Sequence, residues 1–241
     1  MIPLRDRNPT RRTPIVTIGL IVACFVAFAI ELSVTASGGD EALARFFVQW
    51  GAVPADITRA LESGNYVSPA ILGMFTSMFL HGGWLHILGN MLFLWIFGNN
   101  VEDRLGRIPF LIFYLFGGIA AALTQVVIDP QSEVPLVGAS GAIAAALGAY
   151  IVLFPGARIL SLVFLGFFYQ LLEVPALILL GFWFVLQLIS GVGSLGGDAA
   201  QGGVAFFAHV GGFVLGVVVG LLLRVVGAGT PRERPRSGPM G

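Results

Sequence analysis

Six long apolar stretches, separated by shorter polar segments, dominate this chain of 241 residues. Their approximate limits are 15–33, 84–101, 108–128, 139–154, 171–190 and 204–226. About 20 apolar residues let an α-helix cross the hydrocarbon core of a bilayer. Only helices and closed barrels satisfy their backbone hydrogen bonds in lipid, and runs of this length favour helices. The pattern predicts an all-α membrane protein with six transmembrane helices.

The composition agrees with a membrane location. Hydrophobic residues make up 56% of the chain and charged residues 11%, whereas about a quarter of a soluble domain is charged. The formal net charge is zero, so no nucleic-acid partner is expected, because such partners usually require a basic patch. The single cysteine, Cys24, excludes an intrachain disulfide and is expected to be a buried thiol.

The first apolar stretch follows a short basic segment, as the apolar region of a signal peptide would. It continues to about Ser33, however, and ends without a clear small-residue cleavage pattern. We therefore expect it to be a retained transmembrane helix.

The arginines predict the orientation. All 13 basic residues are arginine. With the N-terminus inside, the cytoplasmic segments hold Arg5, Arg7, Arg11, Arg12, Arg104, Arg107, Arg158, Arg224, Arg232, Arg234 and Arg236. Only Arg45 and Arg59 fall outside, so the positive-inside rule places both termini in the cytoplasm. The expected organisation is a cytoplasmic N-terminal segment (1–14), a membrane domain (15–226) and a disordered cytoplasmic tail (227–241).

Two outer loops carry further patterns. Within residues 40–64, Leu43, Phe46, Phe47 and Trp50 recur at helical spacing, which predicts a short amphipathic helix in the outer interface. The fifth loop, residues 191–197, is rich in glycine and is expected to be mobile.

In this orientation the second, fourth and sixth stretches all begin at the outer face. His86 and Asn90, Ser140, and His209 stand near these three beginnings. The topology therefore predicts that they lie at a similar depth in the outer half of the membrane.

Ser140 and His209 are a candidate nucleophile and general base. Ser140 could instead be a helix N-cap or a small packing residue, and His209 could simply bond across helices. Ionisable side chains inside a span are costly, however, and usually functional. One small-residue face carries Gly212, Gly216 and Gly220, and another carries Ala144 and Gly148. If these faces pack together, Ser140 and His209 come close, and the helix N-terminus offers free N–H groups for an oxyanion.

His86 and Asn90 are four residues apart and share one helix face. Their side chains could form interhelical hydrogen bonds, or they could donate to an oxyanion. His81 falls on a different face, so a structural or loop role is expected for it.

No metal or cofactor is expected. Three histidines could bind zinc, but the chain has no His-Glu-x-x-His pair. A carboxylate that could complete a triad is also missing near the predicted site, because Glu133 and Asp198 fall in outer loops and Glu173 near the inner face. A Ser-His dyad is the simpler proposal.

Together these motifs resemble the rhomboid intramembrane serine proteases over about residues 70–220. The residues that carry the resemblance are His81-Gly82-Gly83-Trp84-Leu85-His86-Ile87-Leu88-Gly89-Asn90, Gly138-Ala139-Ser140-Gly141 and Ala208-His209-Val210-Gly211-Gly212. The resemblance implies a six-transmembrane-helix rhomboid-like bundle with Ser140 as nucleophile and His209 as general base. It also implies an oxyanion hole of His86, Asn90 and the Ser140 backbone N–H, and a structural role for Glu102 and Gly106.

The chain departs from the family pattern at two places. Many rhomboids have a tryptophan-arginine pair in the first loop, where this chain has Leu72-Gly73. Many also place a tyrosine four residues after the serine, stacked on the histidine, where this chain has Ala144. The departures leave open how the first loop is anchored and how the imidazole is held.

The expected function is therefore endopeptidase cleavage of transmembrane segments near the outer face, with membrane-protein substrates and the lipid bilayer as partners. The fifth loop would act as a lid, and a bacterial plasma membrane is the expected location. The alternative is a non-catalytic rhomboid-like protein that binds or escorts transmembrane clients. A transporter is disfavoured because the chain has no inverted repeat.

Overall fold

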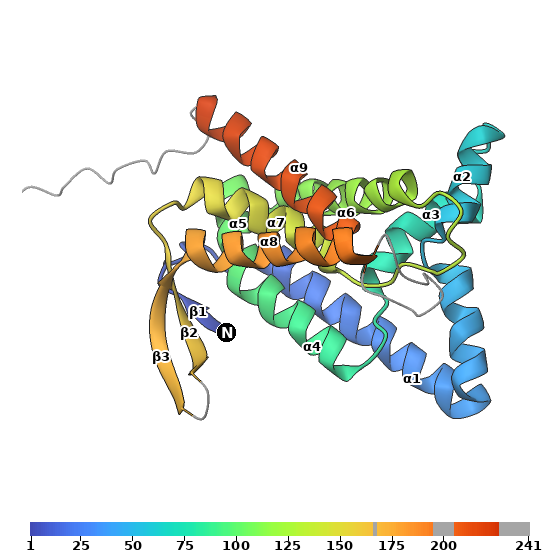
Figure 1. Ribbon diagram of the computed structural model, residues 1–241, viewed down its shortest axis with the longest axis horizontal. Helices are drawn as coiled ribbons and strands as arrows, with labels where there is room; N and C mark the ends of the chain where they lie inside the picture. Colours follow the sequence, from blue (N-terminus) through green and yellow to red (C-terminus); the bar gives the residue numbers. More distant parts are fainter. Residues whose placement is uncertain (166–167, 195–204, 227–241) are drawn as a thin grey trace, which may run out of the picture.

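The computed structural model describes residues 1–165, 168–194 and 205–226, and within these ranges the chain is mostly helical (Figure 1). The helices are α1 (Ile15–Trp50), α2 (Pro54–Glu62), α3 (Pro69–Thr76), α4 (Trp84–Phe93), α5 (Asn99–Leu105), α6 (Arg107–Ile128), α7 (Ser140–Leu153), α8 (Ala176–Ser194) and α9 (Phe206–Val225), with a 3-10 turn η1 (Ser77–Phe79) and a π-helical segment η2 (Leu94–Gly98). The strands are β1 (Ile2–Asp6), β2 (Arg158–Leu165) and β3 (Phe168–Pro175). The predicted tail, 227–241, lies outside the described residues.

Four helices are long and apolar enough to cross a membrane, namely α1, α6, α8 and α9. A fifth candidate is a pair of helical segments, Pro69–Phe79 and Trp84–Leu105, which meet at an angle of 79°. Helix α7 is apolar but has only 14 residues. The predicted membrane character is therefore confirmed, whereas the count of six transmembrane helices stays a prediction.

A small sheet accompanies the helices, although the sequence predicted an all-α protein. β2 lies between β1 and β3 and pairs with both in antiparallel fashion. The fifth span was expected from residue 171, but residues 171–175 belong to β3 and the helix begins at Ala176. Short apolar runs do not distinguish a strand from a buried helix, which explains the error. The hairpin of β2 and β3 extends from the end of the bundle where the N-terminus lies (Figure 1).

The first loop also differs in detail from the prediction. Its residues 40–50 are helical, as expected, but they continue α1 beyond a break at Gly39, where φ is 68°. Positive φ is readily adopted by glycine, so the chain can turn there. Phe46 packs against Phe47 and Trp50 in this second part of the helix. The short α2 follows as a separate helix.

The predicted mobile fifth loop is described only in part. Residues 191–194 form the last turn of α8 rather than a loop. Residues 195–197 lie outside the described residues.

Helix α7 lies at the centre of the bundle, in contact with α6, α8 and α9 (Figure 1). Its contact with α9 is so close that backbone meets backbone. A Cβ on Gly212 would lie 2.2 Å from the carbonyl oxygen of Gly141, and one on Gly216 would lie 2.0 Å from that of Ala145. The predicted packing of the two small-residue faces is therefore confirmed.

The residues noted at the end of the second span hold α1 against α5. The Glu102 carboxylate accepts hydrogen bonds from the Val16 and Thr17 backbone N–H groups and from the Thr17 hydroxyl, at 2.7–3.0 Å. Gly106 adopts φ 88° where α5 ends and α6 begins. These contacts give Glu102 and Gly106 a structural place in the fold, away from Ser140.

Candidate active site

Ser140 is the first residue of α7, and the chain reaches it through a backbone conformation that requires glycine. Gly138 has φ 127°, in the region that side chains disfavour, and its N–H donates to the Ser77 carbonyl at 2.9 Å. A Cβ on Gly138 would also lie 2.8 Å from His86 Nε2. A glycine at this position thus lets the His86 ring approach the start of α7.

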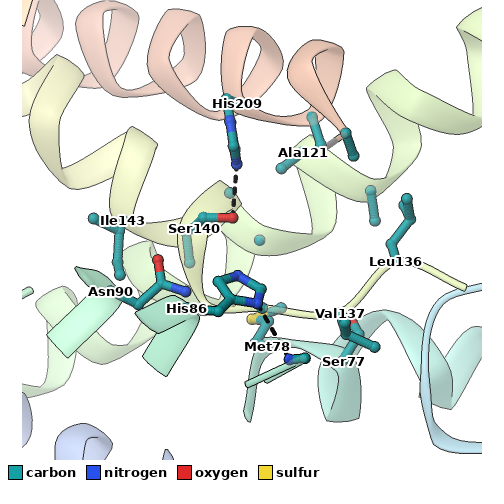
Figure 2. A pocket seen from close by; sticks show the side chains of 18 of the residues that line it. Ser77, Met78, His86, Asn90, Ala121, Leu136, Val137, Ser140, Ile143 and His209 are labelled. Carbon is teal, nitrogen blue, oxygen red and sulfur yellow. Dashed lines mark hydrogen bonds between the residues drawn. The ribbon is translucent and has the colours of Figure 1, made fainter. Parts of the chain in front are cut away.

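His209 meets Ser140 from the neighbouring helix. It stands in the first turn of α9, and its Nε2 lies 2.7 Å from Ser140 Oγ (Figure 2). The close packing of α7 on α9 sets this distance. The predicted proximity of the two side chains is confirmed, and the contact has the geometry of a nucleophile and its base.

The other ring nitrogen of His209 is also bonded. Nδ1 lies 2.7 Å from Oε1 of Gln187, a residue of α8. The Trp183 ring stands beside the imidazole, with 5.8 Å between ring centroids and 37° between planes. Neither α8 residue was singled out from the sequence. The available signal was that Gln187 is the sole amide in a mostly apolar helix.

His86 and Asn90 approach Ser140 from the side opposite His209, both on α4 (Figure 2). The Gly82 N–H donates to His86 Nδ1 at 3.2 Å. A neutral imidazole carries a hydrogen on only one of its two nitrogens. Because Nδ1 accepts this bond, the hydrogen is on Nε2, the atom next to Gly138. His86 can therefore donate a hydrogen bond toward the start of α7.

Asn90 provides a second donor. Its side chain is buried, and within the described part of the chain its Nδ2 has no hydrogen-bond partner. A buried donor without a partner costs about 1–3 kcal/mol, so such groups are usually kept for a reason. An incoming oxygen atom would satisfy it.

These side chains line one cavity of about 700 Å³. Its walls include Ser140, His209, His86, Asn90 and Trp183, and most of the remaining lining is apolar or glycine. Polar groups that converge in an apolar cavity are typical of a site that binds and orients a substrate.

His81 does not line this cavity. It is buried in the turn before α4, where its N–H donates to the Glu31 carboxylate at 3.0 Å. Its ring packs edge-on against His86, with centroids 5.2 Å apart. Across the described ranges, no group of three or more histidine, cysteine, aspartate or glutamate side chains could hold a metal ion.

The structure also shows how the first loop is anchored and what lies beside the imidazole, the two points that the departures from the family pattern left open. Gly73 lets α3 approach the end of α1, because a Cβ there would lie 2.4 Å from the Gly51 carbonyl oxygen. The next residue, Ala52, pairs with Leu136 in a short antiparallel bridge. The first loop is thus anchored to the segment that leads to Ser140. Ala144 is fully buried, and α8 supplies the aromatic ring beside His209.

Comparison with known proteins gives a family. The family model described as the Rhomboid domain matches residues 69–225, more than half of the chain. Rhomboid protein 1, mitochondrial, from Saccharomyces cerevisiae is 34% identical over 161 residues, which cover 65% of this chain and 42% of the yeast protein. Rhomboid protease GluP from Bacillus subtilis is 33% identical over 148 residues, which cover 61% of this chain and 26% of GluP.

A plant protein, Rhomboid-like protein 11, chloroplastic, from Arabidopsis thaliana, is 40% identical over 75 residues, or 31% of this chain and 26% of the plant protein. The chain thus spans less than half the length of each of these relatives. The matched region nevertheless contains the helices that carry Ser140, His86, Asn90 and His209. By its sequence, this chain belongs to the rhomboid family.

Proposed function

We propose that this protein is an intramembrane serine endopeptidase that cleaves transmembrane segments with a Ser140–His209 dyad. The observation that carries the proposal is the 2.7 Å contact between Ser140 Oγ and His209 Nε2. The opposite imidazole nitrogen is engaged by Gln187, so Nε2 is the nitrogen free to accept the serine proton. The name of the relative GluP, a rhomboid protease, supports the same reaction class.

In this mechanism Ser140 Oγ attacks the carbonyl carbon of the scissile peptide bond while His209 Nε2 takes the hydroxyl proton. The tetrahedral intermediate collapses when the imidazolium gives that proton to the leaving amine, which leaves an acyl-enzyme on Ser140. Water, deprotonated by His209, then attacks the acyl-enzyme and releases the second product. The reaction needs no metal or cofactor.

The negative oxygen of each tetrahedral intermediate would be stabilised from the other side of Ser140. His86 Nε2–H, Asn90 Nδ2 and the Ser140 backbone N–H are the three donors we assign to this oxyanion hole. The bond from Gly82 to His86 Nδ1 and the unpaired Asn90 Nδ2 support the assignment. Preorganised donors of this kind contribute about 3–4 kcal/mol each to transition-state stabilisation.

We further propose that residues 15–226 form a six-span membrane domain of a bacterial plasma membrane, with both termini cytoplasmic and cleavage near the outer face. The pairing of β1 with β2 supports part of this topology, because it puts the N-terminal segment beside the connection that follows α7. Both segments carry the arginines that the positive-inside rule assigns to the cytoplasm. Membrane proteins whose transmembrane segments unwind readily are the proposed substrates.

The test is cleavage of a transmembrane substrate by purified protein, together with labelling by a fluorophosphonate, which reacts with an activated serine. Ser140→Ala and His209→Ala should each lower cleavage by about 10⁶-fold, the cost of removing one member of such a unit. Labelling should be lost in both variants. A Ser140→Ala protein that still cuts would overturn the proposal. Stable binding of transmembrane clients without cleavage would instead favour the non-catalytic escort function.

A further inference from the structure

Two side chains of α8 hold the imidazole of His209. Trp183 and Gln187 are four residues apart and therefore share one face of the helix. Trp183 lies beside the ring, and Gln187 Oε1 lies 2.7 Å from Nδ1. Within the described residues, no carboxylate forms a hydrogen bond or ion pair with His209.

The Gln187 contact selects one tautomer of the neutral imidazole. A carbonyl oxygen only accepts hydrogen bonds, so Nδ1 must carry the hydrogen. Nε2 then has a free lone pair, and it is the nitrogen that lies 2.7 Å from Ser140 Oγ. In the other tautomer Nε2–H would point at the serine, and the imidazole could not take the serine proton.

The α7 side of His209 has no room for an aromatic ring that would stack on the imidazole. Ala144 stands where many rhomboids have a stacking tyrosine, and it is fully buried against α9. A Cβ on Gly212 would already be 3.4 Å from the Ala144 Cβ. A large side chain at 144 would separate the two helices that hold Ser140 and His209.

We propose that Gln187 is a positioning residue that fixes the Nδ1–H tautomer of His209, and that Trp183 restrains the ring plane. The inference rests on the proposed function, since tautomer selection matters only if His209 is the base. An amide in this position has a chemical precedent in the Cys-His-Asn arrangement of papain-like proteases. The site is then a Ser-His-Gln unit assembled from α7, α9 and α8.

The experiment compares Gln187→Leu with Gln187→Glu, and uses Gln170→Leu as a matched control on the exposed strand β3. Leucine removes the acceptor, whereas glutamate keeps an acceptor of the same length. The measurements are the rate of fluorophosphonate labelling of Ser140 across pH, and kcat and KM for a transmembrane substrate. Thermal unfolding of each purified variant verifies that it is folded.

Gln187→Leu should lower kcat and the labelling rate by about 10²- to 10⁴-fold with little change in KM, since the wrong tautomer costs about 10⁴ in a serine protease triad. Gln187→Glu should stay within about tenfold of the parent at alkaline pH. The acid limb of its pH–rate profile should move to higher pH, because a carboxylate stabilises imidazolium. Gln170→Leu should match the parent throughout.

Two results would overturn the inference alone. One is a folded Gln187→Leu protein whose labelling rate and pH profile match the parent. The other is a Gln187→Glu protein as inactive as Gln187→Leu, which would mean that residue 187 donates to Nδ1 instead of accepting. If Gln187→Leu fails to fold, Gln187→Met of similar length takes its place. A parent protein whose Ser140 is never labelled would overturn the proposed function itself, and this inference with it.

Discussion

Helices α7 and α8 both contribute to the candidate site, yet they are held in very different ways. Helix α7 buries 11 of its 14 residues. Helix α8 buries only Ala176, Leu179, Leu180 and Gly191 among its 19 residues. The first is fixed by backbone contacts with α9 at distances that leave no space for a Cβ. The second presents most of its surface outward and touches the site through Trp183 and Gln187.

This difference separates two requirements of the proposed chemistry. The distance between Ser140 and His209 is set by the most densely packed interface in the bundle, α7 on α9. Under our proposal, the orientation of the imidazole is set by α8, which buries far fewer of its residues. If Ser140 and His209 are the reacting groups, a densely packed interface holds their spacing, whereas the third group, Gln187, comes from a more exposed helix.

The strongest test of this contrast places the same substitution on each helix. In Gly148→Leu, the new Cβ would lie 2.1 Å from the Phe213 carbonyl oxygen of α9. In Gly181→Leu on α8, it would meet no atom within 4 Å. Overpacking against backbone should destabilise Gly148→Leu by about 3 kcal/mol, the upper end of the usual range, and abolish labelling of Ser140. Gly181→Leu should be nearly neutral in both.

Thermal unfolding in detergent and fluorophosphonate labelling measure these two effects. Equal melting temperatures for the Gly148→Leu and Gly181→Leu proteins would contradict the division into a rigid and a loosely held helix.

The next prediction extends the comparison to Asn90 on α4, a buried side chain whose Nδ2 has no hydrogen-bond partner within the described residues. Asn90→Ala removes a buried donor that makes no hydrogen bond in the described structure. The substitution should lower kcat by about 10²- to 10³-fold with KM little changed. It should not lower stability by more than about 1 kcal/mol, because no hydrogen bond is lost. Kinetics and thermal unfolding of one preparation measure both, and a variant that unfolds early with normal kcat would show that Asn90 is structural.

The smallest predicted effect concerns the opposite end of α7, where Tyr150 donates to the Asp6 carboxylate at 3.0 Å and Asn100 donates to the same oxygen. Burial raises the pKa of Asp6, and the two hydrogen bonds oppose that rise. The folded state therefore favours the protonated acid. The Asp6 carboxyl therefore contributes fully to stability below its pKa in the unfolded chain, and this contribution is lost as pH rises through its pKa in the folded state.

Asp6→Asn keeps an acceptor for Tyr150 but cannot ionise. The difference in melting temperature between Asp6→Asn and the parent should shift in favour of the variant as pH rises from acidic to neutral. Thermal unfolding over that range measures the slope. A difference that stays constant with pH would show that the Asp6 carboxyl does not titrate differently on folding.

The apolar pattern predicted much of this architecture because lipid-compatible helices need long apolar runs. The faces of glycine and alanine predicted that Ser140 and His209 meet, because small residues let two helices pack closely. Residues 171–175 of β3 were assigned to a helix because their apolar run also suits a helix, and β2 falls between two predicted spans. The pairing of β2 with β1 joins residues far apart in the chain, such as Ile2 and Leu162, and no local pattern encodes it.

Gln187 was missed for a different reason. A single amide in an apolar span is a weak signal, because such residues often bond to any nearby helix. Its meaning depends on which face of α8 meets α9, and that is a property of the tertiary fold. The sequence therefore predicted that Ser140 and His209 meet and left open which side chain contacts the other nitrogen of His209.

The length of α7 has a consequence for how water reaches the reaction. At about 1.5 Å per residue, its 14 residues extend for roughly 21 Å, against about 30 Å for the hydrocarbon core. Because α6, α8 and α9 surround α7, its missing length is met inside the bundle and not by the lipid. The cavity of about 700 Å³ lies at the end of α7 that begins with Ser140. If Ser140 is the nucleophile, water has to reach only this cavity, and no channel across the membrane is required.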